Sequence, residues 1–238
     1  MLVKKRLDNL IANAGIATRS EAKKLIRGKR ITADGKVVTD PAAKFDPEET
    51  KLEFDGSPLR IRDYVYLMMN KPAGVVCATE DNVFSTVCDL LPEEYQSFAP
   101  YPVGRLDKDT EGFVLLSNDG DLAHRVISPK HHVPKRYYAK IEGTVTEQHK
   151  ELFQKGVTLE DGYVTMPAQL FLLSADEIEL IIYEGKFHQV KRMFEAVGCK
   201  VTYLKRLEIG PLVLDKTLAL GEIRELSDQE LELLKSVL

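Results

Sequence analysis

Residues 103–120 read VGRLDKDTEGFVLLSNDG, a polar stretch followed by an apolar one. Two glycines, Gly104 and Gly112, enclose a dense set of charged and polar side chains, and Phe113–Ser117 has the composition of a buried strand. Asn118-Asp119-Gly120 predicts a turn. Catalytic groups often lie on a loop held between rigid strands, although by spacing alone a plain connecting loop is the better interpretation.

Short apolar runs separated by turns lie on both sides of this stretch. Tyr64–Asn70 predicts a strand, Lys71–Gly74 a turn and Val75–Cys77 the start of another strand. Further strands are predicted at Arg136–Glu142, Ala168–Ser174 and Glu177–Tyr183, and helices at Thr146–Gln154, at 188–197 and after the capping box Ser227–Glu230. Because strands outnumber helices and are mostly joined by turns, the sequence predicts an α+β fold with a mainly antiparallel sheet.

The N-terminal part has a different pattern. Apolar residues at helical spacing predict a helix over 4–14, and the capping box Thr18-Arg19-Ser20-Glu21 predicts the start of a second helix. Gly28 is expected to end that helix in the left-handed conformation. Asp34-Gly35 between short apolar runs predicts a hairpin.

Charge is distributed unevenly. The whole chain has a formal net charge of -4, whereas the first 36 residues hold ten Lys and Arg against three Asp and Glu, a local charge of +7. A solvated helix face explains such a run, but its helix–turn–strand setting favours RNA as a partner. The basic residues on or just after the second predicted helix are Lys23, Lys24, Arg27, Lys29 and Arg30.

Length and composition allow one or two domains. The 238 residues include 44% apolar residues, enough for a core, and 29% charged residues, a normal surface. The segment 41–63 predicts a closing strand and a linker with a boundary near Arg60, and hence domains at 1–60 and 61–238. No apolar run reaches the roughly 20 residues of a membrane helix, and the N-terminus forms no signal-peptide core, so a cytoplasmic location is expected.

Several common kinds of site find no support in the sequence. It contains neither a phosphate-binding P-loop, nor a dinucleotide glycine pattern, nor a Gly-x-Ser-x-Gly elbow. Cys77, Cys88 and Cys199 are too scattered for a disulfide framework or a zinc site. His131-His132 lacks spaced partner ligands, so two surface or structural histidines are the better interpretation.

The full stretch 103–120 resembles the signature of the RsuA-type pseudouridine synthases, with Phe113 and Ser117 standing where leucine and threonine are common. Three further segments resemble motifs of the same family: Lys71-Pro72-Ala73-Gly74-Val75, Lys135-Arg136-Tyr137 and Glu184–Phe194. Residues 2–50 are similar to the S-four-type RNA-binding module. The resemblance implies a small α/β RNA-binding module followed by a mainly antiparallel, mixed-sheet catalytic domain.

The resemblance also implies the chemistry. Pseudouridine formation takes a uridine out of the RNA stack, breaks its N1–C1′ bond and rejoins the base through C5. Asp107 is implied as nucleophile at C1′ or base at C2′, and Lys191 as the cation that keeps Asp107 ionised. Tyr137 is implied as the platform for the flipped base, with Tyr138 on the opposite side of the strand, in the core. No step requires a metal, nucleotide or redox cofactor.

RNA contacts are implied for two further groups. Arg105 is expected to guide the phosphate of the flipped nucleotide or to fill the gap in the duplex. The remaining expected RNA-binding residues are the basic ones, Lys23, Lys24, Arg27, Lys29, Arg30 and Lys71. Without the resemblance, Lys191 fits helix-surface charge and Tyr137 fits a core aromatic.

Several functions fit these features. Ser128–His132 and Lys155–Val157 resemble the small-subunit branch of the family, which implies uridine 516 of 16S rRNA as the target, free or in an assembly intermediate, and a monomeric enzyme. A large-subunit (23S) rRNA uridine is an alternative target. A non-catalytic ribosome-assembly protein and a carboxylate glycosidase are alternatives from other classes. The glycosidase needs a second carboxylate and has no use for a basic module.

Overall fold

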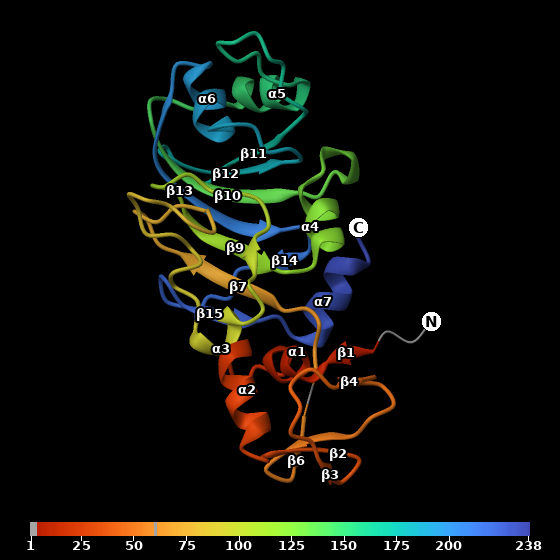
Figure 1. Ribbon diagram of the computed structural model, residues 1–238. Coiled ribbons are helices and arrows are strands. Elements are labelled where there is room, and N and C mark those ends of the chain that lie inside the picture. The colour runs from red at the N-terminus through yellow and green to blue at the C-terminus, as the bar shows by residue number, and fades with distance from the viewer. Residues whose placement is uncertain (1–3, 60) are drawn as a thin grey trace. The chain divides into compact units, whose positions relative to one another are not determined.

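The computed structural model describes residues 4–59 and 61–238, so the predicted boundary at Arg60 lies outside the described residues and stays a prediction. The chain forms two compact units (Figure 1). The first contains the described residues up to Val65 together with Leu91–Pro100, which includes the short helix α3 (Glu93–Gln96). The second contains Tyr66–Leu90 and Tyr101–Leu238.

The first unit packs two helices and short strands around one apolar cluster. Its elements are β1 (Lys5–Arg6), α1 (Leu7–Asn13), α2 (Arg19–Arg27), β2 (Ile31–Ala33), β3 (Lys36–Val37), β4 (Lys44–Phe45), β5 (Leu52–Phe54) and β6 (Ser57–Pro58). The strands pair in the order β3-β2-β5-β6, and β1 pairs separately with β4. Leu7, Leu10, Ile11 and Ile26 are fully buried against Ile31.

Local sequence signals account for most of this unit. The Thr18 hydroxyl accepts from the Glu21 amide at 3.3 Å and the Glu21 carboxylate accepts from the Thr18 amide at 2.9 Å, which confirms the capping box. Asp34 and Gly35 both have positive φ (48° and 75°), as a two-residue hairpin turn requires. The prediction for Gly28 is wrong. Its φ is -72°, and Lys29 (φ 60°) takes the left-handed position because the helical hydrogen bonds continue one residue further.

The second unit is built on a nine-stranded mixed sheet. Its order is β11 (Gln169–Leu172), β12 (Glu177–Ile182), β10 (Lys135–Glu142), β13 (Lys200–Ile209), β9 (Glu111–Ser117), β7 (Tyr66–Lys71) and β15 (Ile223–Glu225), with β14 (Leu212–Val213) on β13 and β8 (Tyr101–Pro102) on β9. The pairing of β13 with β9 is parallel and the other described pairings are antiparallel. The predicted α+β fold with a mainly antiparallel sheet is confirmed.

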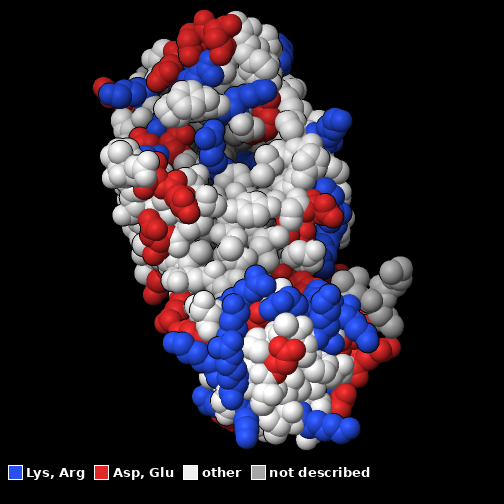
Figure 2. All heavy atoms as spheres, in the orientation of Figure 1, with Lys and Arg blue, Asp and Glu red and all other residues white. Residues whose placement is uncertain are grey.

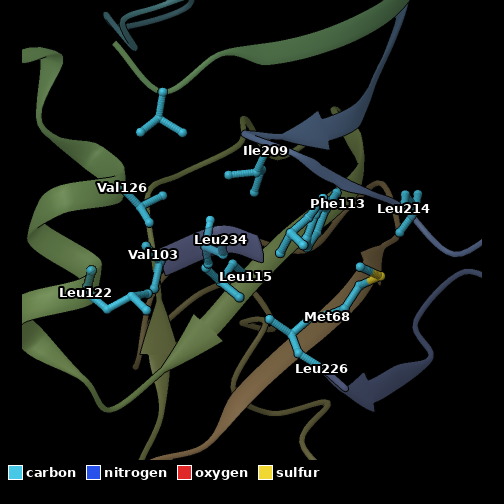
Figure 3. Packing of buried hydrophobic residues seen from close by; sticks show 13 residues of the cluster. Met68, Val103, Phe113, Leu115, Leu122, Val126, Ile209, Leu214, Leu226 and Leu234 are labelled. Atoms are coloured by element: carbon cyan, nitrogen blue, oxygen red, sulfur yellow. The ribbon is translucent and has the colours of Figure 1, made fainter. Parts of the chain in front are cut away.

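The helices of the second unit lie on this sheet and at its ends. They are α4 (Gly120–Ile127), α5 (Glu147–Lys155), α6 (Gln189–Glu195) and α7 (Asp228–Lys235). Figure 3 shows the core in which Phe113 and Leu115 of β9 pack with Val126 of α4, Ile209 of β13 and Leu234 of α7. In the described part of the chain, no helix combines the length and apolar character needed to span a membrane.

Two predictions of elements in this unit need correction, and one strand was missed. Asn118-Asp119-Gly120 is not only a turn, because Asp119 accepts from the Leu122 amide at 3.0 Å and thereby caps α4. Val75–Cys77 contributes a single bridge, Val76 to Thr86, in place of a strand. The long strand β13 was not predicted, since charged residues interrupt its apolar pattern.

Candidate active site

The segment between β8 and β9, residues 103–110, borders a cavity of about 740 Å³ in the second unit. We call this segment the 103–110 loop. Strand β10 contributes Lys135 and Tyr137 to the lining, β13 contributes Arg206, and the turn before α6 contributes residues 184–188. A volume of this size lies within the range of small-molecule sites and is large enough for one nucleotide.

Asp107 lines the cavity, and its carboxylate contacts Lys191. The Lys191 ammonium lies 3.2 Å from Asp107 Oδ2 and donates to Asp109 Oδ1 at 2.6 Å, and His188 Nε2 lies 3.6 Å from Asp107 Oδ1. Burial works against the charge of Lys191, but its bonds to the two carboxylates outweigh that effect and raise its pKa. Burial likewise opposes ionisation of Asp109, whose pKa is nevertheless lowered by the hydrogen bond from Lys191. The raised pKa of Lys191 thus places a charged ammonium beside the Asp107 carboxylate.

Lys71 braces the 103–110 loop from inside. Its side chain is fully buried, and its ammonium donates to the backbone oxygens of Pro72, Asp107, Lys108 and Thr110 at 2.8–3.2 Å. Burial lowers the pKa of Lys71. The expectation that Lys71 contacts RNA is therefore corrected: the ammonium has no exposed surface, and it holds the backbone of Asp107 in place.

Tyr137 and Tyr138 lie on opposite faces of β10, as strand alternation requires. Tyr137 is 7% exposed and lines the cavity, with its hydroxyl 3.5 Å from Arg206 Nη1. The prediction that Tyr138 belongs to the core is wrong. Its ring is partly exposed and packs edge-on against Tyr203, and a hydrogen bond to Glu177 raises the pKa of Tyr138 to about 12.

Two cavity cations were not predicted from the sequence. Lys135 is 9% exposed, and its ammonium donates to the backbone oxygen of Val126 at 3.1 Å. Burial, followed by the charge of Arg206, lowers the pKa of Lys135 to about 8. Arg206 is 4% exposed and donates through Nε to the backbone oxygen of Phe113 at 2.7 Å. Strand alternation is the signal that finds both, because Lys135 shares a face with Tyr137, and Arg206 shares a face with buried Leu204.

Gly112 fixes the place of Arg206. The parallel pairing puts Gly112 directly beside Arg206, with φ +100° at the glycine. A Cβ at this position would lie 2.2 Å from the backbone oxygen of Arg206, a distance that no side chain permits. The glycine that ends the polar stretch of the sequence therefore lets β9 and β13 approach closely enough to carry Arg206 into the cavity.

The turn before α6 is fixed by a buried glutamate. Glu184 is 2% exposed and accepts from the Tyr163 hydroxyl at 2.6 Å, the Met166 amide at 2.8 Å and the Gln189 amide group at 3.1 Å. Gln189 in turn accepts from the Lys186 amide at 2.9 Å. These bonds hold the start of α6, from which Lys191 projects toward the 103–110 loop.

The expected RNA-binding residues of the first unit lie on its surface. Figure 2 shows Lys and Arg side chains gathered over this unit. Lys24, Arg27 and Lys29 are exposed and Lys23 is partly exposed, and none of the four forms an ion pair within residues 4–59 and 61–238. Arg30 differs, because its guanidinium forms an ion pair with Asp55 and lies 4.4 Å from the centre of the Phe54 ring. Arg105, in the second unit, is exposed at the rim of the cavity.

Comparison with known proteins defines the class. The family described as RNA pseudouridylate synthase matches residues 65–196, and the S4 domain matches residues 5–50. The chain therefore belongs to the RNA pseudouridylate synthase family and carries an S4 domain ahead of the catalytic region. Among the described residues, no group of three or more His, Cys, Asp or Glu could hold a metal ion.

Individual relatives match almost the whole chain. An uncharacterized RNA pseudouridine synthase of Bacillus subtilis, YtzG, is 47% identical and the match covers 96% of this chain and 98% of that one. The ribosomal small subunit pseudouridine synthase A of Escherichia coli is 42% identical over 95% of this chain and 98% of its own length. A crystal structure of a pseudouridylate synthase superposes with a TM-score of 0.69 at 38% identity, covering 96% of this chain and 99% of that chain.

Proposed function

We propose that this pseudouridine synthase acts on ribosomal RNA and converts uridine 516 of 16S rRNA to pseudouridine. The observation that carries the chemistry is the pair of Asp107 and Lys191, 3.2 Å apart at the wall of a nucleotide-sized cavity. The small-subunit target is supported by the 42% identity to the Escherichia coli enzyme, whose name specifies the ribosomal small subunit. The proposal includes a cytoplasmic, monomeric enzyme that acts on rRNA or on an assembly intermediate.

Asp107 acts at the sugar in this proposal. Its carboxylate either attacks C1′ or removes a proton from C2′, and in both cases the N1–C1′ bond breaks and the base departs with the bonding electrons. Lys191 stabilises the carboxylate. Since Lys71 holds the carbonyl oxygens of Asp107 and Lys108, the carboxylate needs little reorganisation before it reacts.

In this proposal the ring of Tyr137 stacks on the flipped base. Stacking on one aromatic ring contributes roughly 1–3 kcal/mol per base, enough to offset part of the unstacking of the uridine. After the base rejoins through C5, the C5 proton must leave, and the Tyr137 hydroxyl is the group proposed to assist. Arg105 at the rim contacts the phosphate of the flipped nucleotide or the gap that it leaves.

The target is tested by mapping pseudouridine in 16S and 23S rRNA from a strain that lacks the gene, and then from the same strain complemented with the wild type. Loss and recovery at uridine 516 alone is the expected result. Loss at a 23S uridine would overturn the target but leave the reaction intact. Release of tritium from C5-labelled uridine in rRNA fragments tests the reaction itself, and its absence with every fragment would favour an assembly protein without activity.

A further inference from the structure

Two buried cations of the cavity lack a counter-ion among the described residues. Within residues 4–59 and 61–238, neither Lys135 nor Arg206 forms an ion pair. The Lys135 ammonium has one hydrogen-bond acceptor, the backbone oxygen of Val126, for its three donors. Arg206 uses Nε on the backbone oxygen of Phe113, and its buried Nη2 has no hydrogen-bond partner in the described structure. Both side chains line the cavity.

Such an arrangement is costly for folding. A buried cation is normally compensated by a carboxylate, and a buried donor without an acceptor destabilises the folded state. Here both defects occur side by side, and the close approach of β9 and β13 at Gly112 holds Arg206 rigidly in place. Unsatisfied donors on a rigid support are suited to a ligand that brings acceptor oxygens and negative charge.

The family's reaction produces a group of this kind. When the N1–C1′ bond breaks, its electron pair stays with the base, and uracil becomes an anion whose charge is shared by N1 and the carbonyl oxygens O2 and O4. The base then forms the C5–C1′ bond, either as the bond between Asp107 and C1′ breaks or as C2′ regains the proton that Asp107 removed. Transfer of the proton from C5 to N1 gives the neutral product. Tyr137, the proposed platform for the base, is near both cations: it shares a strand face with Lys135, and its hydroxyl is 3.5 Å from Arg206 Nη1.

We infer that Lys135 and Arg206 form the subsite for the departing uracil, donating hydrogen bonds to its carbonyl oxygens and stabilising the anion formed when N1–C1′ breaks. The inference rests on the reaction of the family and on the proposed place of the base at Tyr137, not on the choice of uridine 516. An RNA phosphate is a weaker candidate ligand, because Arg206 and Lys135 are buried in the sheet whereas exposed Arg105 lies at the rim.

The test compares two leaving groups. Single-turnover rates are measured on an rRNA fragment that the wild type modifies, made either with uridine or with 5-fluorouridine at the target. Conversion is followed after nuclease digestion as loss of the starting nucleoside, separated by liquid chromatography before mass spectrometry, because pseudouridine has the same mass as uridine and the fluorinated base keeps its fluorine at C5. The fluorine withdraws electrons and stabilises the uracil anion without help from the protein. The variants are Arg206→Gln and Lys135→Met, with Arg136→Gln as the matched control, since Arg136 lies on β10 but points away and pairs with Glu179 and Glu208.

For each cavity variant we expect a loss of about 100-fold with uridine, the size typical of removing one donor from a site of developing negative charge. The loss should be much smaller with 5-fluorouridine, and RNA affinity should be unchanged because the anion is absent from the ground state. The control should match the wild type on both RNAs. If Arg206→Gln does not fold, as judged by its melting curve, Lys135→Met decides the question.

Three results would overturn the inference. Wild-type rates in Lys135→Met would mean that the cations do not act on the base. An equal loss of rate with both RNAs would mean that the two cations have only a structural role. Weakened RNA binding with an unchanged rate at saturation would assign them to a phosphate. Failure of the target proposal looks different, because it changes which fragment the wild type accepts and not the ratio between the two leaving groups.

Discussion

The two units use the same residue types in opposite ways. In the first unit, Lys24, Arg27 and Lys29 are neighbours in sequence, exposed, and interchangeable in what they offer a partner. In the second unit, four cations come from β7, β10, α6 and β13, are largely buried, and each has a different set of partners: Lys71, Lys135, Lys191 and Arg206. Solvent screens each exposed cation, so the effect of exposed cations on binding depends on how many there are. The effect of a buried cation depends on the groups that it contacts.

Removing the Asp107 carboxylate, one of the two that contact Lys191, should have the largest effect. Asp107→Asn keeps the volume but cannot act as an anionic nucleophile or base, so we expect a loss of at least about 10,000-fold in single-turnover tritium release. The melting temperature should hardly change, because Lys191 keeps Asp109 as a partner at 2.6 Å. Asp109→Asn is the matched variant. A rate for Asp107→Asn within about tenfold of the wild type would move the reacting carboxylate to Asp109.

Removing the brace under the 103–110 loop comes next. Lys71→Met leaves four carbonyl oxygens, one buried and three partly buried, without their shared donor. At about 1 kcal/mol for each we expect roughly 4 kcal/mol of lost stability, seen as a fall of about 10 °C in melting temperature. Lys108→Met, on the same loop but exposed, is the control and should melt like the wild type. Equal melting of the two variants would contradict the bracing role.

The hydroxyl of Tyr137 should have a smaller but clear effect. Tyr137→Phe keeps the stacking face and removes the group proposed to assist loss of the C5 proton, so turnover should fall about 100-fold while RNA affinity stays the same. The measurement is product formation against RNA binding for both proteins. Wild-type turnover in the Phe variant would mean that Tyr137 contributes only stacking and that its hydroxyl does not assist loss of the C5 proton.

The exposed cations should change binding without changing chemistry. Replacing Lys23, Lys24, Arg27 and Lys29 by glutamine should flatten the dependence of log K on log salt by about four units, one for each phosphate that the variant no longer neutralises. The rate at saturating RNA should be that of the wild type. Four exposed lysines of the second unit serve as the control set, Lys155, Lys200, Lys216 and Lys235. An identical slope for both quadruple variants would place the RNA-binding surface elsewhere.

The smallest expected effect is a gain in stability, whereas the changes above cause losses. It therefore separates a buried cation from an exposed one most clearly. Lys135 keeps its proton up to pH 10.5 when unfolded but only to about pH 8 when folded, so charged Lys135 destabilises the fold at neutral pH by up to about 3 kcal/mol. Lys135→Met also loses the bond to Val126, and the net gain in stability at pH 7 should be about 1–2 kcal/mol.

This gain has a defined pH window. Between pH 8 and 10.5 the unfolded wild type binds more protons than the folded one, so wild-type stability rises with pH and the advantage of Lys135→Met shrinks. Urea unfolding of both proteins at pH 7 and pH 10 measures the difference in their free energies of unfolding. A variant less stable than the wild type at pH 7 would contradict the cost assigned to the buried charge.

Sequence patterns predicted what depends on neighbours in the chain. The capping boxes at Thr18 and Ser227 and the hairpin at Asp34-Gly35 form as expected, since each depends on a few adjacent residues. The Asp107–Lys191 pair was predicted only through the family resemblance, because no spacing rule joins residues 84 positions apart. The structure brings the two side chains together, while their roles in the reaction stay predictions.

The sequence did not show which face of a strand is buried. Alternation separates Tyr137 from Tyr138 but does not say which of them faces the core, so the prediction put Tyr138 in the wrong environment. Arg206 was missed because a Lys-Arg pair inside β13 resembles a solvated surface. The prediction that Lys71 binds RNA failed for the same reason. A lysine or arginine reveals its burial only through tertiary packing, and burial decides its role.

The four oxygens around the Lys71 ammonium resemble the coordination shell that backbone carbonyls provide for a potassium ion. Unlike a free ion, this cation is tethered to β7, so its local concentration does not depend on the medium and it cannot be exchanged for sodium or washed out. The geometry of the 103–110 loop is thus insulated from the ionic composition of the cell. Whatever sensitivity to monovalent salt the enzyme shows should come from its encounter with RNA and not from its reacting groups.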